Sequence, residues 1–195
     1  MDAITQWDVN ILTYIFEHIQ KDWLTPIMTV ITHMGKGGGV WIVMIFFLLL
    51  FKKTRPIGIA CTLGLLINVI LCNGVIKPIV ARPRPYDLVE ALMPALKVKP
   101  QWDYSFPSGH TSASFATTSV LPWMKVKKRF WIPAICLAGL IGLSRLYVCV
   151  HYPTDVICGL LLGCLAGFLG FMLYTLVLEK RMPRAIMEFS FKKAA

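Results

Sequence analysis

Residues 144–155 read SRLYVCVHYPTD and place an arginine, a histidine and an aspartate between two strongly apolar segments. Pro153 can open a helix but cannot continue one, so we expect one helix to end near Cys149 and the next to begin near Pro153, with Asp155 in its first turn. An ionisable side chain at the centre of a membrane helix costs on the order of 3 kcal/mol, so such residues usually have a function. The stretch therefore predicts two membrane helices joined by a corner that carries a site.

Three side chains of this corner suit phosphate chemistry. Asp155 follows His151 by four residues, so its carboxylate can accept the ring N–H across the corner and leave the other ring nitrogen free as a nucleophile. The forked guanidinium of Arg145 is suited to binding phosphate oxygens. Taken alone, the stretch is equally compatible with a salt-bridged corner in which the aspartate is only a helix cap.

The composition indicates a polytopic membrane protein. The 195 residues are 56% hydrophobic and only 15% charged, and the mean hydropathy of +0.65 is too high for an ordinary soluble domain. The net charge of +10 comes from short basic clusters between apolar runs, which indicates the positive-inside arrangement and no nucleic-acid partner. The start of the chain lacks the features of a cleaved signal peptide, so we expect the spans themselves to direct insertion.

The apolar runs predict an all-α, polytopic membrane helical bundle that forms a single domain over residues 1–195. The run at 23–34 is shorter than the roughly 20 residues that a span needs, so it is either an oblique half-span or part of a broken first span, and the bundle has five or six spans. Before it, apolar residues recur every four positions and predict an N-terminal amphipathic interfacial helix over residues 1–22. The other runs are 40–51, 57–76, 110–123, 130–150 and 156–178.

Small and sulfur-containing residues within these runs are expected to pack rather than to react. Gly159, Gly163 and Gly167 recur at four-residue spacing and predict a close-packing helix face. The cysteines lie in or at the ends of apolar segments without metal-ligand spacing, so we expect neither a disulfide framework nor a zinc site. They are Cys61, Cys72, Cys136, Cys149, Cys158 and Cys164.

Two connections between the runs carry glycine, proline or charge. Residues 77–107 form the longest connection, and a connection of that length is usually functional, so we interpret it as an extracytoplasmic active-site loop. Residues 35–39, GKGGG, look like a phosphate-binding loop but follow no strand and lack a lysine–serine pair, so a flexible turn is favoured.

The basic clusters predict the orientation of the chain in the cell membrane. The clusters at 52–55 and 125–129, and the basic tail at 179–195, are all expected to be cytoplasmic. The spans between them then bring three polar segments, 77–84, 108–110 and 145–155, to the opposite, extracytoplasmic face.

Those three segments resemble the signature of the type-2 phosphatidic acid phosphatase superfamily. They read KPIVARPRP from Lys77, PSGH at residues 107–110, and SRLYVCVHYPTD at residues 144–155, and no signature position departs from the family pattern. The resemblance implies a metal-independent phosphatase or diphosphatase that acts on a membrane lipid, in a helical bundle similar to that of the vanadium-dependent haloperoxidases. It implies no cofactor.

The resemblance also assigns phosphate-binding residues. A phosphoryl group in transfer spreads negative charge over its oxygens, and without a metal the protein must supply fixed cations and donors. Lys77, Arg84 and Arg145 are the cations, while Ser108 and the Gly109 N–H lie where a helix begins and its dipole favours an anion.

The catalytic roles follow from the same resemblance. His151 would attack phosphorus and form a phosphohistidine, with Asp155 holding its ring, while His110 would protonate the departing lipid oxygen and then serve as base for water. Arg82, two residues before Arg84, either binds the second phosphate of a diphosphate or faces lipid headgroups.

The expected substrate is a lipid phosphate presented by the bilayer, and no obligate protein partner is evident. We favour hydrolysis of undecaprenyl diphosphate to undecaprenyl phosphate in a bacterial envelope, with phosphatidylglycerophosphate or phosphatidate as alternative substrates. A haloperoxidase is expected to be soluble, a transporter would need an inverted repeat or a pair of broken helices, and a lipid-binding protein with a dead site would have lost His151 or Asp155.

Overall fold

The computed structural model describes residues 1–178, and within these the chain is helical with no strand. The predicted all-α fold is therefore confirmed for this part, whereas the predicted cytoplasmic tail at 179–195 lies outside the described residues. In chain order the elements are α1 (Ala3–Tyr14), η1 (Ile15–Ile19), α2 (Thr25–Met34), η2 (Lys36–Gly38), α3 (Gly39–Leu50), α4 (Arg55–Val69), η3 (Ile70–Ile76), α5 (Lys77–Val80), α6 (Pro85–Leu88), η4 (Glu90–Ala95), α7 (Gly109–Thr118), α8 (Val120–Trp123), α9 (Lys128–Tyr147), α10 (Pro153–Leu173) and η5 (Tyr174–Leu178).

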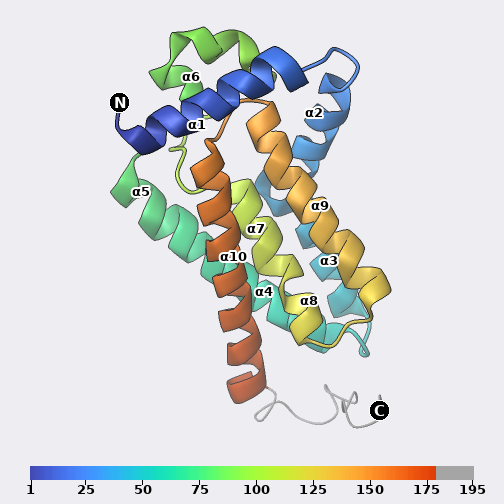
Figure 1. Ribbon diagram of the computed structural model, residues 1–195. Coiled ribbons are helices and arrows are strands. Elements are labelled where there is room, and N and C mark those ends of the chain that lie inside the picture. The colour runs from blue at the N-terminus through green and yellow to red at the C-terminus, as the bar shows by residue number, and fades with distance from the viewer. Residues whose placement is uncertain (179–195) are drawn as a thin grey trace.

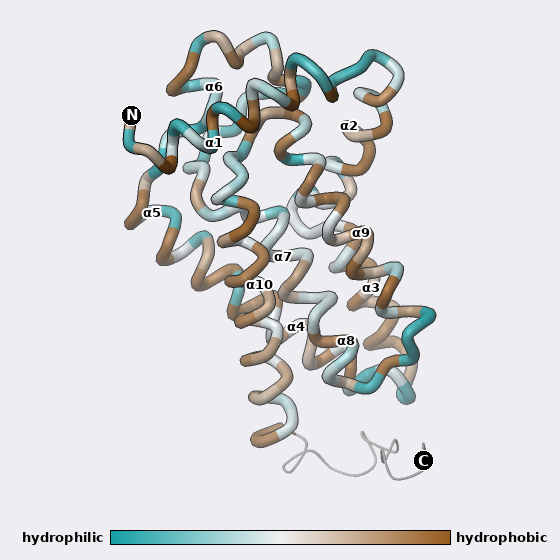
Figure 2. The backbone as a smooth tube through the Cα atoms, in the orientation of Figure 1, coloured by the Kyte–Doolittle hydropathy of each residue, from teal (hydrophilic) through white to brown (hydrophobic). Residues whose placement is uncertain are grey.

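Helices in the described part are long and apolar enough to cross a membrane more than once. Three such helical stretches are Arg55–Leu88, Lys128–Tyr147 and Pro153–Leu178, and α2 with α3 makes a fourth if the pair, bent by 48°, is one broken span. Figure 2 shows hydrophobic residues along these helices and hydrophilic residues at the connections. The chain is therefore a multi-pass membrane protein.

The bend between α2 and α3 is made by glycine. Gly37 and Gly38 have φ values of +58° and +72°, in the left-handed region that a side chain disfavours. The segment at 35–39 is thus a structured turn between two helices.

Helix α10 packs along α4 and α7 (Figure 1), and glycine allows the close approach. A Cβ added at Gly163 would lie 2.4 Å from the carbonyl oxygen of Ser112, and one at Gly170 would lie 2.3 Å from the backbone nitrogen of Gly64. The predicted close-packing face of this helix is confirmed, and it fixes α7 against α10.

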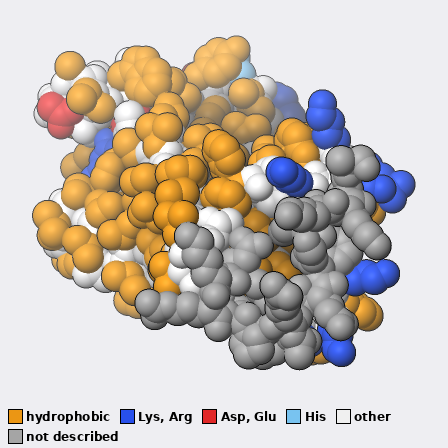
Figure 3. Space-filling view, turned by 90° about the horizontal axis from the view of Figure 1, so that it is seen from below, with side chains coloured by type: hydrophobic (Ala, Val, Ile, Leu, Met, Phe, Trp, Pro, Cys, Tyr) orange, Lys and Arg blue, Asp and Glu red, His pale blue; other side chains and the backbone are white. Residues whose placement is uncertain are grey.

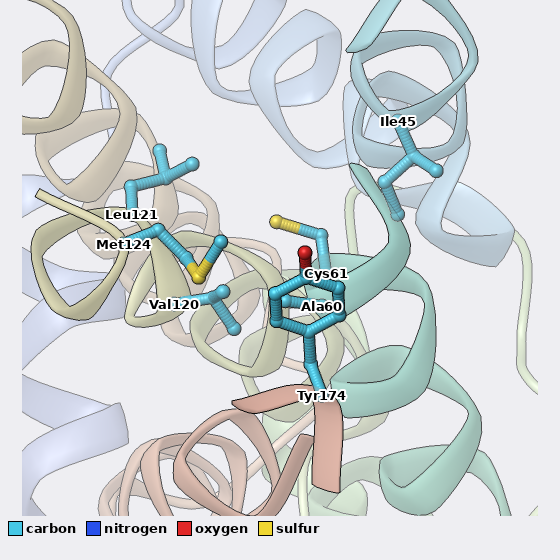
Figure 4. Close-up of a cluster of buried hydrophobic side chains, with 7 residues drawn as sticks. All are labelled: Ile45, Ala60, Cys61, Val120, Leu121, Met124 and Tyr174. Atoms are coloured by element: carbon cyan, nitrogen blue, oxygen red, sulfur yellow. The ribbon is translucent and has the colours of Figure 1, made fainter. Parts of the chain in front are cut away.

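A hydrophobic cluster joins α3, α4, α8 and η5 at one end of the bundle (Figure 4). Its members are Ile45, Ala60, Cys61, Val120, Leu121, Met124 and Tyr174. Three of them, Ala60, Cys61 and Val120, are completely buried. Large side chains on the outside, such as Phe46 and Leu161, are more than half exposed, as expected for a surface that faces lipid.

One end of the bundle carries the basic connections, and the other end carries the polar signature segments. The basic α3–α4 and α8–α9 connections lie at the lower end of Figure 1, and Figure 3 shows Lys and Arg side chains on this face. Helix α1, α6 and the α9–α10 corner lie at the opposite end, with α1 crossing over the start of α10. The polar signature segments therefore meet at the end away from the basic clusters.

Candidate active site

The corner between α9 and α10 presents His151. Helix α9 ends at Tyr147 and α10 begins at Pro153, close to the predicted boundaries. The backbone N–H of Tyr152 donates to Asp155 Oδ2 at 3.0 Å, which caps the start of α10. His151 is only 1% exposed but lines a cavity, so its ring is fixed and still reaches the site.

The imidazole of His151 lies between a carboxylate and an arginine. Its Nδ1 is 3.4 Å from Asp155 Oδ2, and its Nε2 is 3.4 Å from Arg84 Nη1. Ser105 Oγ donates to the same carboxylate oxygen and lies 3.5 Å from Nδ1. With the ring proton on Nδ1, facing the carboxylate, Nε2 keeps its lone pair for attack.

The surroundings of His151 keep the ring neutral. Burial lowers the pKa of His151 well below its ordinary value of 6.5, and the positive charges of Arg84, Arg145 and Lys77 lower it further. A neutral imidazole is the form that can act as a nucleophile.

Three buried cations converge on this histidine from different parts of the chain. Lys77 begins α5, Arg84 precedes α6, and Arg145 lies in the last turn of α9. They are 6%, 3% and 3% exposed, respectively. The loop residue Asp103 pairs with two of them, forming an ion pair with Lys77 and accepting from Arg84 Nη2 at 2.6 Å.

The charge of Asp103 is stabilised by this pairing. Burial alone would raise the pKa of Asp103, but the hydrogen bond and charge of Lys77, and then Arg84, lower it from 3.8 to about 2. A carboxylate therefore contacts the same two cations that a phosphate would use.

Arg145 has one buried donor without a protein partner. Its Nη1 donates to Thr32 Oγ1 of α2 at 2.7 Å, which orients the guanidinium. Its Nε is buried and makes no hydrogen bond. Because a buried unsatisfied donor is costly, this group is suited to a bound anion.

The start of α7 brings Gly109 to the cavity, whereas the predicted phosphate-binding residue Ser108 is fully buried and does not line it. Ser108 is the N-cap of this ten-residue helix, and its backbone N–H donates to the carbonyl oxygen of Asp155 at 3.0 Å, which ties the start of α7 to the start of α10. A Cβ added at Gly109 would meet nothing closer than Asn73 Oδ1 at 3.7 Å, so the backbone there is open to a ligand. His110 follows and faces the cavity.

The cavity joins this polar cradle to an apolar wall and has a volume of about 590 Å³. The polar part includes Lys77, Arg84, Gly109, His110, Arg145 and His151. The apolar part comes from α3 and α4, with Ile42, Leu65, Leu66 and Val69. The turn from Gly35 to Gly38 also lines it, so the segment that sequence alone favoured only as a turn forms part of the wall.

Arg82 is placed elsewhere. Its Nη1 donates to Asp155 Oδ1 at 2.7 Å and its Nη2 donates to Asp8 Oδ2 of α1 at 2.7 Å. Its guanidinium carbon lies 3.9 Å from the centre of the Tyr152 ring. The residue does not line the cavity around His151, so this arrangement gives no support to a second-phosphate role.

Several residues of the site had no sequence signal that assigned them a role. Asp103 is one of many charges in a long loop, and Thr32, Ser105 and Asp8 belong to no recognised spacing. Among residues 1–178, no group of three or more His, Cys, Asp or Glu side chains is arranged to hold a metal ion.

Comparison with known proteins decides the family. The family model described as the PAP2 superfamily matches residues 58–179. The chain belongs to the PAP2 superfamily. This stretch contains all three signature segments. The relatives described below are named as lipid phosphatases, and together with the family match they show that the protein is a membrane lipid phosphatase.

Two curated relatives of this PAP2 protein differ in named activity. An undecaprenyl-diphosphatase of Sulfolobus acidocaldarius is 37% identical over 158 residues, which cover 80% of this chain and 75% of the relative. Phosphatidylglycerophosphatase B of Bacillus subtilis is 30% identical over 168 residues, which cover 77% of this chain and 75% of the relative. Both substrate classes are therefore represented among its relatives.

Solved PAP2 structures share the fold. The crystal structure of a transmembrane PAP2-type phosphatidylglycerolphosphate phosphatase from Bacillus subtilis superposes with a TM-score of 0.71 at 30% identity, covering 93% of this chain and 89% of that one. The Aquifex aeolicus LpxE structure gives a TM-score of 0.66 at 27% identity, and the match covers 83% of this chain and 93% of that one.

Proposed function

We propose that this PAP2 protein hydrolyses a lipid phosphate or diphosphate through a covalent phosphohistidine at His151, with no metal required. The observation that carries the proposal is the position of His151, which lines a cavity together with Lys77, Arg84 and Arg145. Three fixed cations supply the charge stabilisation that a metal would otherwise provide.

In the first step, His151 Nε2 forms a bond to phosphorus and the bond from phosphorus to the leaving oxygen breaks. His110, protonated when the negative phosphate is bound, donates that proton to the leaving oxygen and becomes neutral, so the lipid departs neutral at this atom. Asp155 faces the opposite ring nitrogen at 3.4 Å and balances the positive charge that the imidazole gains.

In the second step, water attacks phosphorus and the bond to Nε2 breaks. His110 has lost its proton in the first step and accepts one from the water, so inorganic phosphate leaves and both histidines return to their starting states. The backbone N–H of Gly109, at the start of α7, holds a phosphate oxygen throughout.

For the substrate, we favour undecaprenyl diphosphate, which is hydrolysed to undecaprenyl phosphate and phosphate. A second cavity of about 720 Å³ adjoins the first at His110 and Arg145, and it is lined by His33, Lys36, Lys97 and Lys99 with no carboxylate residue in its lining. An anionic group beyond the scissile phosphate would be attracted there. The apolar wall of α3 and α4 suits a long prenyl tail, and the Sulfolobus relative carries this activity in its name.

Phosphatidylglycerophosphate is the alternative substrate with a specific observation in its favour. The Bacillus subtilis relative and the structure with the TM-score of 0.71 both carry that activity in their names. Phosphatidate, which has a single phosphate, would make no use of the basic second cavity. A transporter or lipid-binding protein would have no need of the His151–Asp155 pair.

The proposed arrangement in the membrane has five spans, with α2 and α3 as one broken span and α7 with α8 as a short one beside α4, α9 and α10. The basic connections at 52–55 and 125–129 are cytoplasmic by the positive-inside rule, which puts the 77–107 loop and the site on the extracytoplasmic face of a bacterial membrane. Helix α1 lies at the interface, since Ile4 and Trp7 are more than half exposed on it.

The test measures phosphate release by purified protein in detergent without divalent metal. Undecaprenyl diphosphate, phosphatidylglycerophosphate and phosphatidate are compared as specificity constants. We expect the diphosphate to be preferred, and Lys97→Ala with Lys99→Ala to reduce that preference. A tenfold preference for phosphatidylglycerophosphate, about 1.4 kcal/mol, would reject the substrate and keep the mechanism. Activity abolished by a chelator and restored by magnesium would reject the mechanism.

A further inference from the structure

Asp8, in the N-terminal helix α1, is completely buried although α1 lies at the surface of the bundle. Its Oδ2 accepts from Arg82 Nη2 at 2.7 Å and from Thr154 Oγ1 at 2.5 Å. Its Oδ1 accepts from the backbone N–H of Thr154 at 2.9 Å. A buried carboxylate is costly unless it is fully paired, and here each oxygen is engaged.

The same arginine reaches the catalytic pair. Arg82 Nη1 donates to Asp155 Oδ1 at 2.7 Å, while Asp155 Oδ2 accepts from Ser105 and Tyr152 and faces His151 Nδ1 at 3.4 Å. The fork of Arg82 thus bridges two buried carboxylates, one on α1 and one on α10. The chain of contacts runs from Asp8 through Arg82 and Asp155 to His151.

The charges along this chain of contacts show what Asp8 adds. Arg82 contributes one positive charge and the two aspartates contribute two negative charges, so one negative charge remains to face the imidazole. That charge is needed when Nε2 bonds to phosphorus and the ring becomes positive. Without Asp8, Arg82 would neutralise Asp155 and leave the phosphorylated ring unbalanced.

We propose that Asp8 and Arg82 are positioning residues for catalysis, acting through Asp155 on His151, so that α1 forms part of the catalytic apparatus. The inference rests on the proposed phosphohistidine mechanism. Asp8 does not touch the cavity around His151, so it is expected to affect the rate of phosphoryl transfer and not the binding of phosphate.

The experiment compares Asp8→Asn with Asp2→Asn in the full-length protein. Asp2 caps α1 by accepting from the backbone N–H of Thr5 at 2.8 Å, so the control makes the same charge change on the same helix outside the network. We expect Asp8→Asn to slow phosphoenzyme formation about 10- to 100-fold, the range found when a group that orients a metal-bound histidine is removed. KM and the inhibition constant for inorganic phosphate, which binds without a bond to His151, should stay within about twofold of wild type, because the residues that hold the anion are unchanged.

A double-mutant cycle separates positioning from general stability. If Asp8 acts through Asp155, the double variant Asp8→Asn/Asp155→Asn will be no slower than Asp155→Asn alone. If the double variant is slower than Asp155→Asn by the full factor that Asp8→Asn causes alone, the inference is overturned. A wild-type rate in Asp8→Asn would also overturn it. Wild-type phosphoenzyme formation in Asp155→Asn would instead overturn the proposed mechanism.

Arg82→Lys provides a second variant if Asp8→Asn fails to fold. The lysine keeps the charge but has no fork, so it can pair closely with only one of the two carboxylates at a time. We expect slower phosphoenzyme formation with unchanged inhibition by inorganic phosphate, and an unchanged rate would contradict the proposal.

Discussion

Replacement of Asp103 by asparagine should strengthen the binding of phosphate-like anions. Asp103 contacts Lys77 and Arg84, the cations proposed to hold the phosphate, and its lowered pKa of about 2 keeps it charged at neutral pH. A bound anion would therefore share these cations with a carboxylate. Asparagine has nearly the same shape and keeps an oxygen acceptor, so the substitution chiefly removes the negative charge.

The size of the effect follows from Coulomb's law. Two unit charges about 6 Å apart repel by roughly 3 kcal/mol at an effective dielectric constant of about 20. The Asp103 side chain is 35% exposed, so solvent screens part of this repulsion. A remaining effect of about 1.4 kcal/mol corresponds to a tenfold lower inhibition constant for orthovanadate.

The assay is orthovanadate inhibition of phosphate release, and the control is Asp87→Asn. Asp87 is an exposed residue of α6 in the same connection and takes no part in the ion pairs with Lys77 and Arg84. We expect the control to resemble wild type. If Asp103→Asn instead weakens vanadate inhibition, the carboxylate assembles the cations and does not compete with the anion, and the reasoning is refuted.

Three further predictions concern packing, positioning and pH. Gly163→Ala should lower the free energy of unfolding by about 1–3 kcal/mol, because the new Cβ would lie 2.4 Å from a carbonyl oxygen of α7. The control Gly139→Ala should leave it unchanged, because no atom lies within 4 Å of the added Cβ. Thermal unfolding in detergent compares the two variants. Thr32→Val should reduce kcat/KM roughly tenfold by removing the hydroxyl that orients Arg145, and an unchanged value would contradict this. The His151 ring should stay neutral in an NMR titration to well below pH 6.5. Below pH 6.5 the unfolded chain binds a proton at His151 and the folded chain does not, so the free energy of unfolding should fall as the pH is lowered.

The helices and the corner could be predicted from sequence because local rules determine them. Pro153 restricts where a helix can begin, and the apolar runs on both sides are long enough to span a bilayer. The spacing of glycine along α10 likewise identified its packing face. The sequence left the short run at 23–34 as either a half-span or part of a broken span. The sharp bend between α2 and α3 depends on the backbone of Gly37 and Gly38, which the apolar pattern does not reveal.

The polar network behind His151 could not be predicted, because its contacts join residues far apart in the chain. Arg82 and Asp8 are 74 residues apart, and Arg82 and Asp155 are 73 apart. Because Arg82 lies two residues before Arg84, the sequence was equally compatible with a phosphate-binding role and with contact to lipid headgroups. The direction of its side chain, toward two carboxylates and away from the cavity, depends on how α1 and α10 pack.

Direct trapping of the covalent intermediate tests whether His151 is the nucleophile. Purified protein is mixed with a substrate labelled in its terminal phosphate, quenched within milliseconds, and the label is mapped to a peptide. The mechanism predicts an acid-labile, alkali-stable phosphohistidine at His151, which is absent from His151→Ala but still forms in His110→Ala when the leaving group is good. Label retained in His151→Ala, or mapped to another residue, would contradict the account.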